Sequence, residues 1–268
     1  MNLLTCMLTQ NRCYKTGQKI KPKGVMVHST GANNPNLRRY VQPANNDPNK
    51  DELLKQLGTN KNHNDWNRSD LNVCVHGFIG KLADNSIAAV QTLPWNYRGW
   101  HAGNGTSGKS ANDTHVSFEI CEDGLDDPDY FAAVYKTAVE LTAMLCKEYN
   151  LNPLANGVVI CHSEGYKRGI ASAHADVEHW FPLFGKNMND FRNDVNKAMK
   201  EPEPEEDNMK YYKYYSDIPE YYQDAILKVM STGALKGEGK DKDDNVILNV
   251  SEDFCRTMTV LDRMHLLD

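Results

Sequence analysis

The sequence lacks the features of a membrane-spanning or exported chain. No apolar run approaches the roughly 20 residues that cross a bilayer, and the mean hydropathy is −0.64. The first residues carry no positive charge ahead of their apolar run, Thr5 and Thr9 interrupt that run, and no small-residue cleavage site follows it. We therefore expect a chain that is made in the cytoplasm without a signal peptide.

A basic surplus and phosphate-binding glycine motifs are missing too. Lys and Arg number 30 against 36 Asp and Glu, so the formal net charge is −6, whereas nucleic-acid-binding domains usually carry a basic patch. The Gly-rich segments have neither the GxxxxGK[ST] nor the GxGxxG order. These absences argue against nucleic acid as a partner and make phosphate binding a weak hypothesis.

Paired cysteine motifs are the third absence. Seven cysteines are present, an odd number, and none of them forms a CxxC pair. This usage is typical of a reducing compartment rather than of a disulfide framework. We therefore expect free and mostly buried thiols.

Composition divides the chain into two parts. Residues 201–208 (EPEPEEDN) combine Pro with like charges, which is typical of an extended, solvated linker. The sequence therefore predicts a large domain over residues 1–200, an acidic Pro-rich linker over 201–210, and a small helical domain over 211–268.

Hydrophobic periodicity predicts the elements of both parts. Strands are expected at Gly24–His28, Leu71–Ile79, Ser86–Thr92, His115–Cys121 and Val158–Cys161, and helices at Asp51–Leu57, Asp129–Tyr149, Asn187–Met199, Pro219–Thr232 and Ser251–Leu267. The segment before the first of these strands, Met1–Lys23, is expected to be irregular.

Potential metal ligands gather after the last predicted strand of the large domain. His162, His174, Asp176 and His179 fall within eighteen positions of one another. His and Asp are zinc-type ligands, and a catalytic zinc usually takes three protein ligands and keeps a fourth position for water. A plain His-rich surface loop has the same composition, so both interpretations are open. His28, at the end of another predicted strand, favours the metal site.

Three further segments carry candidate site residues. Glu119 lies mid-strand between apolar neighbours, which is costly unless it faces solvent or a site that uses its charge. Trp100 and His101 belong to a Gly-rich aromatic loop that suits a carbohydrate or peptide ligand, although buried Trp residues can also simply anchor a loop. His76 is either a core histidine or, if its face of the strand lines a cleft, a site residue.

These motifs occur in the order seen in one enzyme family. They are VMVHST (25–30), VHGFIG (75–80), WHAG (100–103), SFEIC (117–121) and HSEGYKRGIASAHAD (162–176). Over about residues 20–200 the chain resembles the zinc N-acetylmuramoyl-L-alanine amidases of type 2, which are akin to peptidoglycan-recognition proteins. The last motif and the residues after it look particularly like the version in phage and prophage endolysins of Gram-positive bacteria.

The resemblance implies a fold and a metal. The fold is α/β, with a mixed central β-sheet flanked by helices and a zinc cleft on one side. Carried over residue by residue, the zinc ligands are His28, His162 and Asp176. Either His174 or His179 could instead supply the third ligand.

The resemblance also implies the reaction, which is hydrolysis of the amide between the lactyl group of N-acetylmuramic acid and L-alanine in bacterial peptidoglycan. Glu119 would move the proton, and His174, where relatives commonly have Lys, would stabilise the oxyanion. His76, Trp100 and His101 would contact the substrate or support the cleft. A non-catalytic module that binds muropeptides on the same fold is the alternative, and loss of a zinc ligand marks that class. A globular domain with chance histidines explains the strand-terminal His pair poorly.

The C-terminal part resembles a single S-layer-homology motif. The likeness lies in YSDI (215–218), AI (225–226), GALKG (233–237) and SEDFCR (251–256). In that family the repeats bind cell-wall polymers and usually come in threes, so one copy implies either wall targeting or self-association through residues 211–268.

An endolysin of this kind would leave the host cytoplasm through a holin pore; a host autolysin exported by another route is the alternative.

Overall fold

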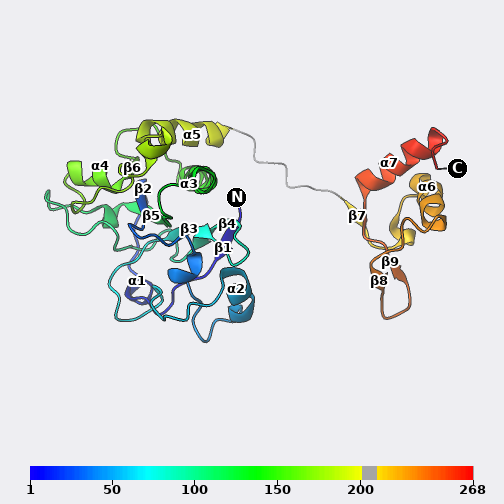
Figure 1. The fold of residues 1–268 in the computed structure, drawn as a ribbon, viewed down its shortest axis with the longest axis horizontal. Coiled ribbons are helices and arrows are strands. Elements are labelled where there is room, and N and C mark those ends of the chain that lie inside the picture. The colour runs from blue at the N-terminus through cyan, green and yellow to red at the C-terminus, as the bar shows by residue number, and fades with distance from the viewer. Residues whose placement is uncertain (201–209, 268) are drawn as a thin grey trace. The chain divides into compact units, whose positions relative to one another are not determined.

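The computed structural model describes residues 1–200 and 210–267 (Figure 1). The chain forms two compact units, residues 1–201 and 202–268, and each is described by itself. Of the predicted linker, 201–210, only Lys210 lies within the described residues. No helix in the described residues is long and apolar enough to cross a membrane.

A six-stranded sheet forms the centre of the first unit. Its order is β1-β4-β3-β5-β2-β6, and every neighbouring pair is parallel except β3 with β4. The strands are β1 (Leu3–Thr5), β2 (Gly24–Ser29), β3 (Gly77–Lys81), β4 (Ile87–Gln91), β5 (His115–Ile120) and β6 (Val159–Cys161). A mixed central sheet was expected, and the structure confirms it.

Two helices cover one face of this sheet. In α3 (Pro128–Glu148), Asp127 caps the first turn by accepting from the N–H groups of Asp129 and Tyr130, and Pro128 occupies a position where no N–H donor is needed. Its apolar face packs on the sheet, and α5 (Met188–Lys200) packs against α3 (Figure 1). The 3.6-residue period of these segments therefore gives the amphipathic helices that it predicts.

The other face carries shorter elements. The 3-10 helix η1 (Leu37–Arg39) and α2 (Lys50–Leu57) bury Leu37, Leu53 and Leu57 against Phe78 and Val90 of the sheet. Of the other 3-10 turns, η3 (Phe181–Phe184) packs Phe181 into the core with α3 and α5 on the first face, and η2 (Ala111–Asp113) precedes β5. The sheet is thus covered on both faces, as a mostly parallel sheet requires.

Three sequence-based expectations about this unit are wrong. The irregular lead-in contains β1, which pairs with β4, and α1 (Arg12–Thr16). The predicted strand 71–79 begins only at Gly77, because Cys74 forms an isolated bridge with Trp100 instead. Not all cysteines are free, since Cys13 and Cys74 form a disulfide. The remaining five are free and buried, as expected: Cys6, Cys121, Cys146, Cys161 and Cys255.

The second unit is built around a helix pair. Helices α6 (Glu220–Ser231) and α7 (Glu252–Arg263) lie side by side (Figure 1). Ser251 caps α7 by accepting from the N–H of Phe254. Two small antiparallel pairs and a 3-10 turn complete it: β7 (Tyr211–Tyr212) with β10 (Val250–Ser251), β8 (Gly239–Lys240) with β9 (Val246–Ile247), and η4 (Tyr215–Asp217). Its own core includes Tyr212, Ile226 and Cys255.

Candidate active site

Parallel strands bring three candidate residues to one edge of the sheet. His28 lies near the carboxyl end of β2, Glu119 lies opposite it in the register of β5, and His162 directly follows β6 as the first residue of α4 (His162–Lys167). Open α/β sheets bind ligands beyond the carboxyl ends of their strands. Residues far apart in sequence therefore meet here because their strands run in the same direction.

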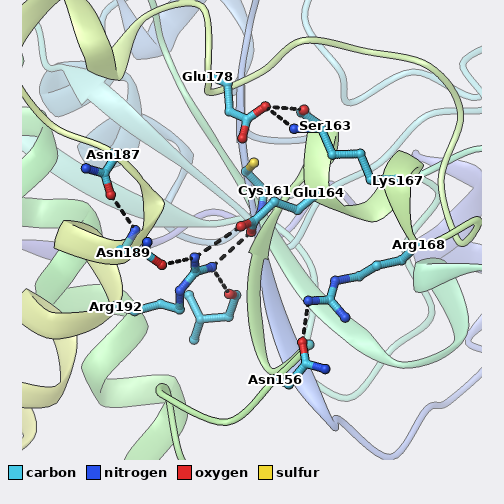
Figure 2. Close-up of polar contacts among 12 residues, drawn as sticks. Asn156, Cys161, Ser163, Glu164, Lys167, Arg168, Glu178, Asn187, Asn189 and Arg192 are labelled. Atoms are coloured by element: carbon cyan, nitrogen blue, oxygen red, sulfur yellow. Dashed lines mark hydrogen bonds and ion pairs between the residues drawn. The ribbon is translucent and has the colours of Figure 1, made fainter.

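The loop that carries Asp176 is tied to the start of α4. The Ser163 N–H donates to the Asp176 carbonyl at 3.0 Å. Two residues further on, Glu178 accepts from the Ser163 hydroxyl and from Lys167, the latter at 2.7 Å (Figure 2). These bonds hold the Asp176 loop against the turn that carries His162.

A second set of bonds fixes α4 to α5. Arg192 donates to both carboxylate oxygens of Glu164, at 2.9 and 3.1 Å, and to the Val159 carbonyl at 2.9 Å (Figure 2). Glu164 also accepts from the Cys161 N–H. A two-point Arg–carboxylate pair constrains orientation as well as distance, so it supports the position of His162 at the helix start.

Three ligand atoms converge in the cleft. His28 Nδ1 lies 3.1 Å from Asp176 Oδ2 and 3.1 Å from His162 Nδ1, and the last two atoms are 3.7 Å apart. A tetrahedral zinc with ligands at about 2.0–2.2 Å separates its ligand atoms by about 3.4 Å. Two imidazole nitrogens and one carboxylate oxygen at this spacing fit a zinc ion, and a fourth tetrahedral position is left for water.

The charge states of His162 and Asp176 suit this role. Burial and the neighbouring His28 lower the pKa of His162 to about 4, so its ring is neutral near pH 7, which is the form that binds metal. Burial alone would raise the pKa of Asp176, but the hydrogen bond and charge of His28 outweigh it and the pKa is lowered. Asp176 is therefore a carboxylate.

The two other candidates for the third ligand line the same cleft but are outside the convergent group of ligand atoms. His174 is exposed, with its Nδ1 3.4 Å from His162 Nδ1, and it is outside the convergent group formed by His28, His162 and Asp176. His179 instead contacts Glu122, with Nε2 2.9 Å from Oε1. The geometry thus favours Asp176, and His174 stands at the rim of the site.

A chain of imidazoles backs the ligand His28. Its second ring nitrogen, Nε2, lies 3.0 Å from Nδ1 of His101. When Nδ1 of His28 binds a metal, Nε2 keeps its proton and donates it to His101 Nδ1, which must then be the unprotonated nitrogen of its own ring. Burial, first, and the nearby His28 hold the pKa of His101 well below its usual value, so His101 can accept. His162 makes the corresponding second contact with the Ser172 hydroxyl at 3.3 Å.

Within the described residues, Glu119 has an unpaired carboxylate oxygen beside the ligand group. Its Oε2 is buried and has no hydrogen-bond partner in the described part of the chain, although the side chain lines the cleft. Burial, with Asp176 and Glu122 nearby, raises its pKa to about 7 against the opposing effect of His28. An unpaired carboxyl that titrates near neutral pH is a functional-site signature.

The family of the chain follows from comparison with known proteins. Residues 18–179 match the model of the N-acetylmuramoyl-L-alanine amidase family, which is more than half of the chain. The chain belongs to that family. No curated protein matches it. With its ligand set complete, the chain is a zinc-dependent amidase that cleaves the bond between N-acetylmuramic acid and L-alanine in peptidoglycan, and the alternative of a non-catalytic recognition module is set aside.

Several solved structures are similar to this amidase. They include PlyL (18% identity, covering 74% of this chain and 98% of that one, TM-score 0.45), the Staphylococcus aureus hydrolase AmiA in complex with its ligand (18%, 74% and 82%, 0.47) and the catalytic domain of XlyA (20%, 73% and 99%, 0.46). Because these TM-scores lie below 0.5, the assignment rests on the family match and the site.

Of the residues predicted to meet substrate, two line the cleft of this amidase and one does not. The cleft encloses about 560 Å³, and Trp100 and His101 are in its wall. His76 is fully buried: its Nδ1 accepts from the Ser117 N–H at 3.0 Å, and its Nε2 donates to the Tyr97 carbonyl at 2.8 Å. With both nitrogens engaged, His76 fits the core-histidine alternative, as a residue that supports the sheet edge.

Some supporting residues were missed from sequence. Asn112 accepts from the N–H groups of His101 and Ala102 at 2.7 and 2.9 Å and so holds the aromatic loop. Ser172 and Glu122 contact His162 and His179. A buried Asn or Ser in a polar loop has no signal in a single sequence, because its role depends on contacts with distant residues.

Proposed function

We propose that this amidase is a lytic, endolysin-type enzyme in which Glu119 carries the proton of the hydrolysis. One observation supports the assignment above the others: the Glu119 side chain lines the ligand cleft, and its Oε2 has no partner in the described residues. A general base needs a vacant acceptor that faces the reacting atoms and a pKa near the working pH.

Zinc, when bound, supplies a water of pKa about 7 and a positive charge close to the scissile carbonyl. Glu119 takes a proton from the attacking water and delivers it to the leaving amine nitrogen as the C–N bond breaks. One water is consumed, and the products are a lactyl carboxylate on the sugar and a free L-alanine amine. Glu119 is a carboxylate before and after each turnover, so the protons in the cycle balance.

His174 is the proposed donor to the developing oxyanion. It is exposed at the rim and lies next to the ligand His162, so it can reach a carbonyl oxygen of bound substrate. Preorganised donors at that oxygen contribute about 10²–10³ in kcat in other acyl-transfer enzymes. His174→Ala should then lower kcat while zinc affinity is kept.

The cellular role is proposed from the substrate and the cysteines. Peptidoglycan lies outside the membrane, so the proposal is that the chain is made in the host cytoplasm and leaves it through a holin pore, with an autolysin exported by another route as the alternative. The Cys13–Cys74 disulfide suits an oxidising destination, while the buried free thiols suit either side. The C-terminal domain predicted over residues 211–268 would hold the enzyme on a wall polymer; self-association is the alternative role.

Wall digestion tests the catalytic proposal. Gram-positive peptidoglycan treated with wild type should gain lactyl carboxylates and L-alanine N-termini in equal number. Glu119→Gln should keep zinc and lose nearly all release, whereas His28→Ala should lose both. Wild-type turnover by Glu119→Gln would refute the general-base role. Deleting residues 211–268 should lower binding to intact walls and leave turnover of a soluble substrate unchanged, which separates wall retention from catalysis. Sedimentation of the full chain measures self-association.

A further inference from the structure

A second pocket lies beside the catalytic cleft. It encloses about 360 Å³, and Trp100 lines both this pocket and the cleft. The two hollows therefore share the Trp100 side chain as a wall. A substrate that extends from the ligand site past Trp100 would reach this pocket.

The pocket is positively charged in an acidic protein. Its lining includes Arg12 and Arg98 and no carboxylate residue among those described. Arg98 donates to Asp113, outside the lining, at 2.6 Å. In the described chain Arg12 has neutral acceptors only, the Ser69 carbonyl at 2.9 Å and Asn72 Oδ1 at 2.7 Å. Since a guanidinium has five N–H donors, Arg12 keeps both charge and donors for a ligand.

The two arginines are held in place around the indole. Arg98 lies over the Trp100 ring, with its Cζ 5.2 Å from the ring centroid. Arg12 begins α1, whose next residue, Cys13, is in the disulfide with Cys74. Cys74 in turn exchanges backbone hydrogen bonds with Trp100, at 3.0 and 3.1 Å. A covalent link and a strand-like bridge thus fix Arg12 relative to Trp100, which reduces the ordering cost of binding.

We propose that this pocket is a subsite for a carboxylate of the stem peptide beyond its L-alanine. The inference rests on the proposed function, because it extends the substrate of the same cleft. Guanidinium groups bind carboxylates through two parallel hydrogen bonds, and an amide in place of the carboxylate forfeits the charge. The amidase therefore prefers muropeptides with a free carboxylate at that position over their amidated forms.

The test compares defined muropeptides that differ only in amidation of one stem-peptide carboxylate. We expect the KM of wild type to be about tenfold lower for the acid than for the amide, because the amide loses one charge-assisted contact. Arg12→Gln and Arg98→Gln should raise KM for the acid to that of the amide with kcat kept, and Arg12→Lys should restore part of the difference. Lys15→Gln, which removes a charge from the same helix outside the pocket lining, is the matched control and should behave like wild type.

Three outcomes would contradict the proposal. If Arg12→Gln and Arg98→Gln cleave acid and amide with the wild-type ratio, the pocket does not bind the carboxylate. Equal KM of wild type for both forms has the same meaning. If Arg12→Gln impairs only intact walls, and the effect disappears once phosphodiester-linked polymers are removed, a polymer phosphate occupies the pocket instead. Failure of wild type to cleave any muropeptide would refute the amidase function rather than the subsite.

Discussion

Replacement of Glu119 by Gln should change stability and activity in opposite directions. The carboxyl belongs to β5, and its Oε2 is buried without a partner in the described residues. Burial, first, and the nearby acidic groups raise its pKa from 4.5 to about 7. That difference corresponds to about 3 kcal/mol of unfavourable ionisation in the folded state.

The sign follows from which state holds the proton. Between pH 4.5 and 7 the unfolded chain has released it while the folded chain retains it, so this group costs wild type stability as the pH rises. Glutamine does not titrate. In metal-free protein, the unfolding free energy of Glu119→Gln minus that of wild type should therefore increase by about 3 kcal/mol from pH 4 to pH 8. Turnover of the zinc form should fall by about 10²–10⁴-fold.

Urea denaturation of the chelator-treated proteins at both pH values measures the difference. Glu52→Gln, at an exposed carboxylate of α2, controls for the removal of one negative charge. A difference between Glu119→Gln and wild type that stays constant with pH would show that the carboxyl is well solvated in the folded protein. The electrostatic argument for its catalytic role would then be wrong.

Three other predictions follow from the described contacts. His101→Phe removes the acceptor for the His28 Nε2–H and should weaken zinc binding about 10–100-fold in a chelator competition, whereas His101→Gln, which keeps an acceptor, should retain more affinity. Replacing Cys13 and Cys74 by Ser opens a loop with a separation of 61 residues and should lower the unfolding free energy by about 2–4 kcal/mol in urea; an unchanged midpoint would contradict this. Burial lowers the pKa of His76 from 6.5 to about 4, so its contribution to stability is complete above pH 6.5 and about 3 kcal/mol is lost as the pH falls to 4. His76→Gln should flatten that part of the pH–stability curve, and a curve identical to that of wild type would show that His76 is not buried as a neutral ring.

The catalytic edge could be predicted because it depends on local patterns. His28 and His162 each follow an apolar, β-branched run, and Glu119 interrupts such a run. Parallel pairing of the three strands then places all three at one edge. Residue type marked the candidates, and the family resemblance chose among the interpretations that the pattern left open, including Asp176 as the third ligand.

The parts that could not be predicted depend on long-range pairing. Leu3–Thr5 is too short to stand out as a strand, and it forms one only because β4 offers a free edge. Cys74 leaves the predicted strand to pair with Trp100 and to bond Cys13. Cysteine partners cannot be read from spacing alone.

The finer chemistry of the site was also beyond sequence. Whether His76 is a core residue or a substrate contact depends on the acceptor at Tyr97 and the donor at Ser117. The role of His101 depends on a 3.0 Å contact with His28. Such contacts are set by tertiary packing to within an ångström, which periodicity does not encode.

The most direct test of the central claim joins metal content to bond identity on one preparation. Mass spectrometry of the purified chain should find about one zinc per molecule, and the same protein should release lactyl carboxylates and L-alanine N-termini from peptidoglycan in a chelator-sensitive way. Undiminished release by protein stripped of zinc, or a zinc-loaded chain that produces neither end, would contradict the account.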